Sequence, residues 1–256
     1  MRIAISVFII CIVLSAPVSV WAAHPFLVED TDIQGTGNFK LELNSDKTKK
    51  DEDKISKLSS VIRWGVSESA DVSLDVPYYT MDPGMVPGHV TRGYGDIQLG
   101  LKQRTYQNEV HQSFAYELYT TVPTGNKEKG LGTDRFVVGL KLIDQQECRG
   151  SNCLHASVGY ESFVSDMKNK HFNTDYAVTY GLAAERKFTP RLRLLMEVAG
   201  DMHRTKETGR TAKPFTAMAG LRYDLFKSWY IDLAGRVGLN KDAEDNTLLL
   251  GTAWKF

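Results

Sequence analysis

The last ten residues of the chain, TLLLGTAWKF from Thr247 to Phe256, decide the fold. Side chains two apart in a β-strand lie on the same face of the strand. The face opposite the terminal residue runs from Lys255 back to Thr247 and is small and mixed in character. The other face forms a mostly apolar and aromatic stripe of Leu248, Leu250, Thr252, Trp254 and Phe256. The stretch therefore predicts a β-strand with one apolar face and an aromatic residue at its end.

A closing strand of this kind is typical of bacterial outer-membrane β-barrels. Trp254 and Phe256 are then the residues that the barrel-assembly machinery recognises. The solvent of such a strand is lipid on its apolar face. We therefore expect outer-membrane lipid and lipopolysaccharide as surroundings, and the outer membrane of a Gram-negative bacterium as the location.

The first residues predict export. Arg2 precedes a short apolar run, and small residues surround a cleavage site after Ala22. This pattern indicates a signal peptide over residues 1–22, which leaves a mature chain of residues 23–256. A transmembrane helix is the alternative, because the run is of borderline length, but Pro17 and the small-residue site favour cleavage. No later segment is free enough of charge to be a membrane helix, so the mature chain is either a soluble exported protein or a barrel.

Composition narrows the class of protein. The chain has 256 residues, 31 basic and 31 acidic, with a formal net charge of zero. No general attraction to nucleic acid follows from this balance, and we expect no nucleic-acid partner. The mean hydropathy of −0.28 is compatible with a barrel, because only alternate residues of each strand face lipid. The length fits one domain.

Period-two patterning predicts an all-β protein. In one example Ile97, Leu99 and Leu101 share a face, while Gln98 and Lys102 share the other. The expected architecture is a single antiparallel up-and-down transmembrane barrel of about twelve strands. The predicted strands are 37–44, 56–66, 69–80, 94–106, 112–122, 134–143, 154–164, 174–188, 190–201, 212–225, 229–240 and 246–256.

Alternation alone does not separate a barrel from a soluble sandwich, but the polar face does. That face mixes charges of both signs with glycine and alanine over most strands, as suits a crowded polar lumen in which opposite charges pair. An ordinary solvated face remains the alternative for each single charge. The predicted lumen residues are Asp96, Lys102, Arg104, Glu117, Lys141, Glu185, Arg193, Glu197, Arg222, Asp232 and Arg236.

Connection lengths support the barrel. Outer-membrane barrels have short periplasmic turns and longer outside loops, so odd-numbered connections should be long. The charged run NSDKTKKDEDKI, residues 44–55, is predicted to be the first long outside loop. The connection from Asp144 to Cys153 is the one exception to the rule, since it is long where a short turn is expected.

Two cysteines, Cys148 and Cys153, lie in the mature chain within CRGSNC. In an oxidising compartment this spacing predicts a local disulfide, which would compensate for the length of that connection. A metal site is the alternative, and it would need ligands beyond His155. We predict the disulfide, and no metal and no cofactor.

Three segments carry a family resemblance: WGVSESADVSLDVPYYT from Trp64, GYGDIQLGLKQRTY from Gly93, and VPTGNKEKGLGTDRFVVGLKL from Val122. The opening EDTDIQGTGNFKLEL from Glu29 fits as well. Together they resemble the outer-membrane barrels grouped as the "MetA-pathway of phenol degradation" family. The resemblance implies an outer-membrane channel or transporter, sometimes tied to aromatic compounds. It implies no set of catalytic or binding residues.

The leading functional hypothesis is passive diffusion of a small molecule, polar or aromatic, through a narrow charged lumen. Twelve strands give a barrel wider than the eight-stranded type, whose interior is filled by side chains. One alternative is a closed barrel with a structural or ligand-binding role. A less favoured alternative is an outer-membrane hydrolase, for which we find no Ser–His pair with an orienting partner and so predict no catalytic residue.

Overall fold

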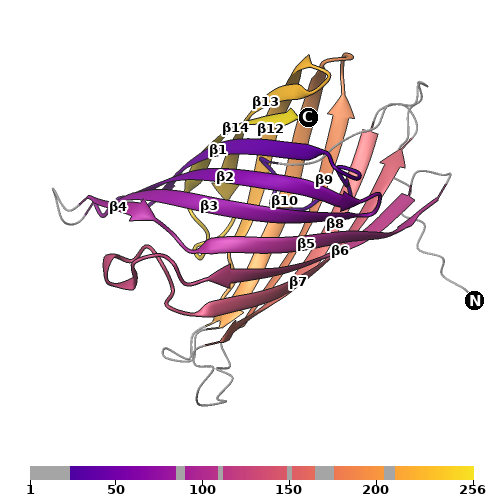
Figure 1. Cartoon of the computed structure of the whole chain (residues 1–256). Helices are drawn as coiled ribbons and strands as arrows, with labels where there is room; N and C mark the ends of the chain where they lie inside the picture. The colour runs from indigo at the N-terminus through magenta and orange to yellow at the C-terminus, as the bar shows by residue number, and fades with distance from the viewer. Residues whose placement is uncertain (1–23, 85–89, 109–111, 149–151, 165–175, 205–210) are drawn as a thin grey trace, which may run out of the picture.

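The computed structural model of the chain describes residues 24–84, 90–108, 112–148, 152–164, 176–204 and 211–256. The predicted signal peptide, residues 1–22, lies outside the described residues and stays a prediction. The described residues form a closed antiparallel barrel of twelve strands (Figure 1). The barrel strands are β1 (Phe39–Lys50), β2 (Asp53–Ser67), β3 (Ala70–Asp82), β5 (Ile97–Gln107), β6 (Gln112–Val122), β7 (Phe136–Cys148), β8 (Asn152–Val164), β9 (Tyr176–Lys187), β10 (Leu192–Arg204), β12 (Phe215–Phe226), β13 (Trp229–Gly238) and β14 (Asn246–Lys255).

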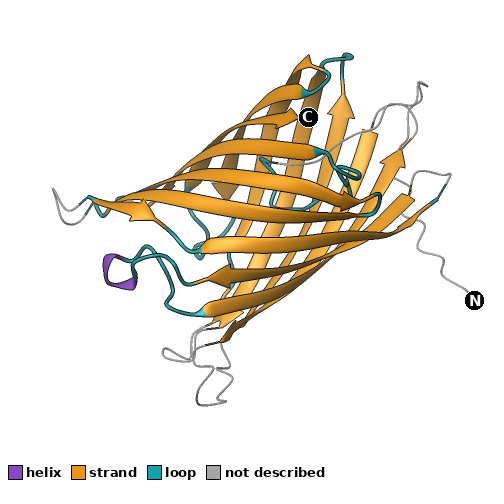
Figure 2. Cartoon of the chain, viewed as in Figure 1, coloured by secondary structure: helices purple, strands orange, loops and turns teal. Residues whose placement is uncertain are grey.

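The barrel closes where its first and last strands meet. Strand β1 pairs with β14 from Lys40↔Lys255 to Lys49↔Asn246. Two short strands, β4 (Thr91–Tyr94) and β11 (Thr211–Ala212), extend the edges of β3 and β10. A single 3₁₀ turn, η1 (Lys127–Lys129), is the helical element of the described residues (Figure 2). Within the described part of the chain, no helix has the length and apolar character needed to cross a membrane.

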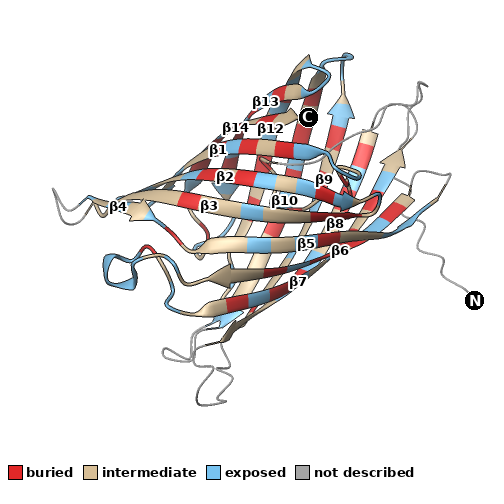
Figure 3. Ribbon diagram, viewed as in Figure 1, coloured by how far each residue is buried: buried red, intermediate tan, exposed pale blue. Residues whose placement is uncertain are grey.

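Burial alternates along the barrel strands (Figure 3). In β14, Leu248 and Leu250 are more than half exposed, while Leu249 and Ala253 are about 1% exposed. The apolar stripe of the closing strand therefore faces outward, as the sequence predicts. The outward residues of the other strands are also largely Leu, Val, Ile and aromatic, which is the surface that a bilayer requires. The predicted all-β barrel of twelve strands is confirmed.

Most connections sort by length, and this gives the barrel two distinct ends. At one end, called the short-turn end, lie the carboxyl terminus and the connections 68–69, 108–111, 149–151, 188–191 and 227–228. The other end, called the long-loop end, carries the connections 83–96, 123–135, 165–175, 205–214 and 239–245. The end that carries the short turns is the periplasmic end in barrels of this kind.

Aromatic rings stack in a row at the short-turn end. Trp229 stacks on Trp254 with ring centroids 5.4 Å apart, and Phe39 stacks on Trp64 at 5.9 Å. Phe256, the terminal residue, lies against Phe39 at 6.3 Å. Aromatic rings at this level suit the boundary between lipid and water. A role of Trp254 and Phe256 in barrel assembly remains a prediction.

The first connection corrects the sequence prediction. NSDKTKKDEDKI is no long loop: residues 44–50 continue β1, residues 53–55 begin β2, and a turn at Asp51 and Glu52 joins the two strands. The prediction was wrong because it took a run of charged residues for a loop, whereas these residues lie in the ends of the two strands. Asp51 adopts a φ of +53°, the left-handed conformation that a tight turn needs.

The predicted disulfide is wrong. Cys148 and Cys153 are not joined in the structure. Strands β7 and β8 run on to Cys148 and from Asn152, and the register pairs Cys148 with Asn152 and Glu147 with Cys153. Directly paired residues share a face and neighbours along a strand do not, so the two cysteines lie on opposite faces of the barrel wall. The same extension leaves three residues between the strands, so the exception to the length rule disappears.

Candidate channel and the segment inside it

The chain between the predicted signal peptide and β1 lies inside the barrel. We call residues 24–34 the inner segment. Its side chains and backbone contact residues of the barrel wall that are up to 211 positions away in the sequence. The segment passes through the half of the lumen nearer the short-turn end, as its partners Asp71, Gln145 and Arg222 show.

His24 is held by two carboxylates of the wall. Its Nδ1 lies 2.8 Å from Asp232 Oδ1 and its Nε2 lies 3.0 Å from Asp46 Oδ1. A carboxylate oxygen accepts hydrogen bonds, so both ring nitrogens donate and the ring is an imidazolium. Asp46 and Asp232 belong to β1 and β13, so this cation bridges two parts of the wall.

The backbone of the inner segment is also bound. The amides of Leu27 and Val28 donate to Glu197 Oε2 at 2.6 and 2.9 Å. Arg222 Nη2 donates to the carbonyl of His24 at 2.9 Å, and Arg236 Nη2 to the carbonyl of Pro25 at 3.0 Å. Charged wall residues therefore satisfy the polar backbone of a segment that has no strand partner of its own.

The acidic residues of the inner segment pair with basic residues of the wall. Asp30 Oδ1 accepts from Lys102 Nζ at 2.9 Å, and Glu29 lies 3.3 Å from both Lys102 and Arg63. Removal of one partner from such a buried pair leaves an uncompensated charge, which costs about 3–5 kcal/mol. These pairs therefore hold the segment at a defined place rather than anywhere in the lumen.

Glycines in the wall make room for the inner segment. A Cβ atom on Gly181 of β9 would lie 2.6 Å from Val28 Cγ2, and one on Gly251 of β14 would lie 2.4 Å from His24 Nδ1. Both approaches are closer than atoms tolerate, so a larger residue at either position would collide with the side chain of Val28 or His24 as it now lies. The wall is thus complementary to the inner segment in shape as well as in charge.

The structure places the predicted lumen residues in three groups. Arg104 lies near the short-turn end, where it donates to the carbonyl of Glu68 at 3.3 Å. Asp96 lies in the connection before β5, where it accepts from the amides of Gly125 and Thr133 and so holds the 123–135 connection. The remaining residues lie on the inward face of the strands, Lys141 lining a cavity and the others buried: Lys102, Glu117, Lys141, Glu185, Arg193, Glu197, Arg222, Asp232 and Arg236. Whether they act on a solute stays a prediction.

The sequence analysis did not predict that residues of the inner segment bind these wall residues. His24, Glu29 and Asp30 precede the first strand, and no periodicity marks them. The acidic cluster EDTD, residues 29–32, which follows shortly after the predicted signal peptide, was the available signal. Its charge complements Lys102 and Arg63 of the wall, but contacts across more than 70 residues cannot be read from spacing.

The inner segment divides the lumen. Two cavities of about 260 and 440 Å3 lie on the side of the long-loop end, and both are lined by Lys57, Asp75 and Glu161. A third cavity of about 610 Å3 lies at the short-turn end, and its lining shares no residue with the other two. Within the described residues, the vestibule from the long loops therefore ends on His24, Pro25 and Phe26.

Comparison with known proteins agrees with this architecture. Residues 25–256 match the family described as "Putative MetA-pathway of phenol degradation". The chain belongs to this family. The resemblance inferred from the sequence motifs is thereby confirmed over residues 25–256. No curated protein matches the sequence.

Solved structures share the fold. The COG4313 outer membrane channel from Pseudomonas putida F1 is similar with a TM-score of 0.71 and 15% identity, over 89% of this chain and 98% of that one. The NanC porin has a TM-score of 0.61 and 8% identity, over 84% of this chain and all of that one. The translocator domain of the autotransporter NalP from Neisseria meningitidis has a TM-score of 0.52 and 12% identity, over 88% and 91%. At these identities the likeness concerns the fold.

The apolar outward face and the family together locate the protein in the outer membrane of a Gram-negative bacterium. The short-turn end then faces the periplasm and the long-loop end faces the exterior. The vestibule therefore opens to the outside, and the cavity at the short-turn end opens to the periplasm.

Proposed function

We propose that the protein is a passive outer-membrane channel for small molecules and that its inner segment is the constriction. The observation that carries this proposal is the division of a polar lumen by residues 24–34, with a water-accessible cavity on either side. A closed barrel with a purely structural role does not require cavities of this size on both sides of the inner segment. Solute passes when the inner segment shifts within the lumen or leaves it.

The inner segment suits a movable constriction because its bonds are polar and exchangeable. Its hydrogen bonds and ion pairs go to charged wall residues, and water that fills the lumen after the segment has left can hydrogen-bond to the same groups. The partners left behind, Glu197, Arg222 and Arg236, have one another nearby: Arg236 Nη2 already lies 3.7 Å from Glu197 Oε1. A wall that can pair its own charges tolerates departure of the segment.

The cargo we propose is small and either polar or aromatic. Inward charges of both signs argue against a strong general preference for cations or anions across the whole lumen. The family description refers to phenol degradation, which supports an aromatic solute. Tyr79 and Tyr119 lie among the residues that line the vestibule and offer ring surfaces to such a solute.

Conductance in planar lipid bilayers tests the proposal. The full-length protein should show low, fluctuating conductance, and an Asp46→Asn/Asp232→Asn variant should conduct more often because His24 loses both carboxylates. Asp201→Asn, which removes the partner of the exposed His203 at the long-loop end, is the matched control and should behave as the wild type. Absence of conductance and of solute flux in all three proteins would contradict a channel and favour the closed barrel.

We infer further that the protein is not an enzyme. Among the histidines that the structure describes, His24 and His155 face the inside of the barrel, and they contact carboxylates and the ring of Phe26 respectively. A hydrolase would place such a histidine against a serine nucleophile. A screen with ester and phospholipid substrates should detect no turnover, and turnover that is lost in His155→Ala would overturn this inference.

A further inference from the structure

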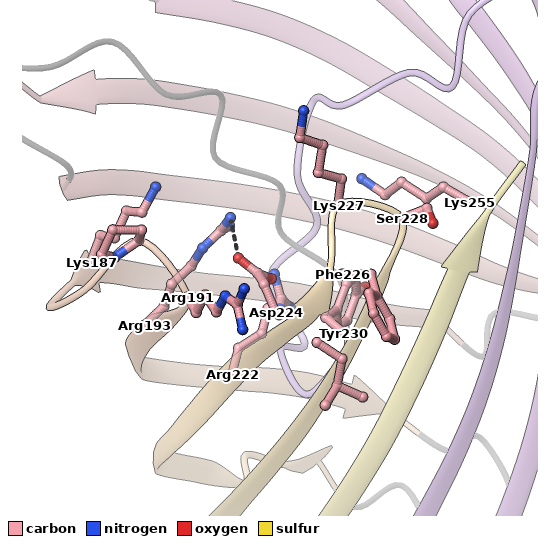
Figure 4. A pocket seen from close by; sticks show the side chains of 12 residues that line it. Lys187, Arg191, Arg193, Arg222, Asp224, Phe226, Lys227, Ser228, Tyr230 and Lys255 are labelled. Atoms are coloured by element: carbon pink, nitrogen blue, oxygen red, sulfur yellow. Dashed lines mark hydrogen bonds and ion pairs between the residues drawn. The ribbon is translucent and has the colours of Figure 1, made fainter.

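The cavity at the short-turn end differs in charge from the rest of the lumen. It has a volume of about 610 Å3 and lies between the turns 188–191 and 227–228. Figure 4 shows Asp224 and Tyr230 among the basic side chains that surround it. Those six basic residues are Lys187, Arg191, Arg193, Arg222, Lys227 and Lys255.

Carboxylates offset only part of this charge. Asp224 Oδ2 accepts from Arg193 Nη2 at 3.2 Å, and Glu185 lies 3.6 Å from both Arg193 and Arg222. Even if Lys255 and Arg222, which have further partners, are left out of the count, four cationic side chains face these two carboxylates: Lys187, Arg191, Arg193 and Lys227. The cavity therefore carries a surplus of positive charge, in a concave site where the wall focuses the field.

The positive surplus is confined to this end of the lumen. The larger cavity of the vestibule has one lysine, Lys57, against Asp75, Asp96 and Glu161. The inner segment stands between the two regions. The charge of the short-turn cavity is thus a local property of the β9–β10 and β12–β13 hairpins and not the general character of the lumen.

The cavity also offers apolar surface beside the charges. Arg222 lies over the ring of Tyr230, with its guanidinium carbon 4.5 Å from the ring centroid. Pro190, Leu225 and Phe226 complete the apolar part of the lining. A site with both features fits an anion with an organic body better than a bare inorganic ion, because the body covers the apolar surface while its acid groups meet the basic residues.

The position of the residues points to a ligand from the aqueous phase. Arg193, Arg222 and Tyr230 are at most 6% exposed and face the lumen, not the lipid. Lys187, Arg191 and Lys227 stand at the mouth, where the periplasmic solvent enters. A lipid headgroup outside the barrel would meet the outward face instead.

We propose that the short-turn cavity binds a small organic anion with two or more carboxylates. The three mouth residues Lys187, Arg191 and Lys227 bind its carboxylates, and Arg193 behind them adds positive charge to the site. This proposal rests on the barrel and its charges, and it stands or falls independently of channel activity. It adds a periplasm-facing binding site to a barrel whose vestibule faces the exterior.

Isothermal titration of the full-length protein in zwitterionic detergent micelles with citrate as the probe tests this site. Wild-type protein should bind citrate, and the triple variant Lys187→Gln/Arg191→Gln/Lys227→Gln should bind it at least about tenfold more weakly, which corresponds to about 1.4 kcal/mol. The matched control Lys127→Gln/Lys129→Gln/Lys241→Gln removes the same charge at the long-loop end, far from the cavity. Its affinity for citrate should stay within about twofold of wild type, which corresponds to about 0.4 kcal/mol. All six positions are partly or fully exposed, so both variants should fold.

Two further arms identify the ligand chemistry. Inorganic phosphate at the same concentration should bind more weakly than citrate, and vesicles of phosphatidylglycerol should not compete with it. Absence of citrate binding at millimolar concentration, an equal loss in both triple variants, or competition by anionic vesicles would each overturn the proposal.

Discussion

His24 and Asp232 are 208 residues apart in the sequence, and their side chains meet inside the barrel at 2.8 Å. Asp232 is about 1% exposed, so this contact is made away from bulk water. A second carboxylate, Asp46, takes the other ring nitrogen. The pair fixes the start of the inner segment to the wall and gives the proposed constriction a defined latch.

Replacement of His24 should loosen this latch. In His24→Gln the cation is lost, and a hydrogen bond to a charged group contributes about 1.5–3 kcal/mol, so the equilibrium should shift toward the displaced segment by about ten- to a hundredfold. The fraction of time that single channels conduct in planar bilayers measures this shift. His203→Gln is the control, because His203 contacts Asp201 in an exposed position at 2.7 Å. Equal conductance of the two variants would exclude His24 as a latch.

The latch should also respond to pH. Burial alone would lower the pKa of His24, but the hydrogen bonds to Asp232 and Asp46 outweigh burial and raise the pKa to about 9. The pKa of His24 is raised only while the inner segment lies in the lumen. Protonation of His24 therefore stabilises this state fully below the ordinary pKa of about 6.5, and the stabilisation is lost as the pH rises through about 9. Wild-type conductance should therefore increase between pH 7 and pH 10. The His24→Gln protein should lack this increase, and an identical pH profile in both proteins would refute the mechanism.

Gly181 should be sensitive to the size of its side chain. Gly181→Val places atoms where Val28 Cγ2 now lies, so the inner segment must move away from β9. We expect higher conductance and faster proteolysis of residues 24–34 in the folded protein. Gly159→Ala is the matched control on the inward face of β8, where an added Cβ meets the side chain of Thr179 and not the inner segment. Similar proteolysis of the segment in both variants would show that the inner segment does not depend on the space that Gly181 leaves for Val28.

Cys148 and Cys153 should both react as thiols, because no disulfide joins them. The protein unfolded in denaturant without reductant should take up two equivalents of a maleimide per mature chain, at Cys148 and Cys153, as measured by intact mass. Prior reduction should not change this number. A chain that reacts only after reduction would contradict the register of β7 and β8 that separates the two side chains.

The sequence predicts the barrel well because its information is local. On the closing strand, Leu248 and Leu250 mark the outward face because apolar residues occur at every second position. Nearly every strand repeats this pattern. The charged hairpin around Asp51 was misjudged because its side chains alternate in position but not in polarity. The disulfide failed for a related reason: only the register of two strands, not a spacing of five, tells that Cys148 and Cys153 face opposite ways.

The inner segment could not be predicted from the sequence. Its contacts are single side chains met across long separations, such as Thr31 with Gln145, and no repeat or motif links them. The lumen charges Glu197, Arg222 and Arg236 were visible as inward residues, but their role as partners of a backbone was not. Shape complementarity at Gly181 and Gly251 likewise appears only when both chain segments are in place.

The most direct test of this account is a reversible cross-link between the inner segment and the wall. In a Cys148→Ser/Cys153→Ser background, Val28→Cys and Gly181→Cys would bring two thiols together, because the Cβ of residue 181 would lie 2.6 Å from the present Val28 Cγ2 and a disulfide needs Cβ atoms about 3.8 Å apart. Single-channel conductance is then recorded before and after reduction of the bond. The account predicts rapid cross-linking, a silent oxidised barrel, and conductance that appears on reduction. Failure of the bond to form, or equal conductance in the oxidised and reduced states, would contradict it.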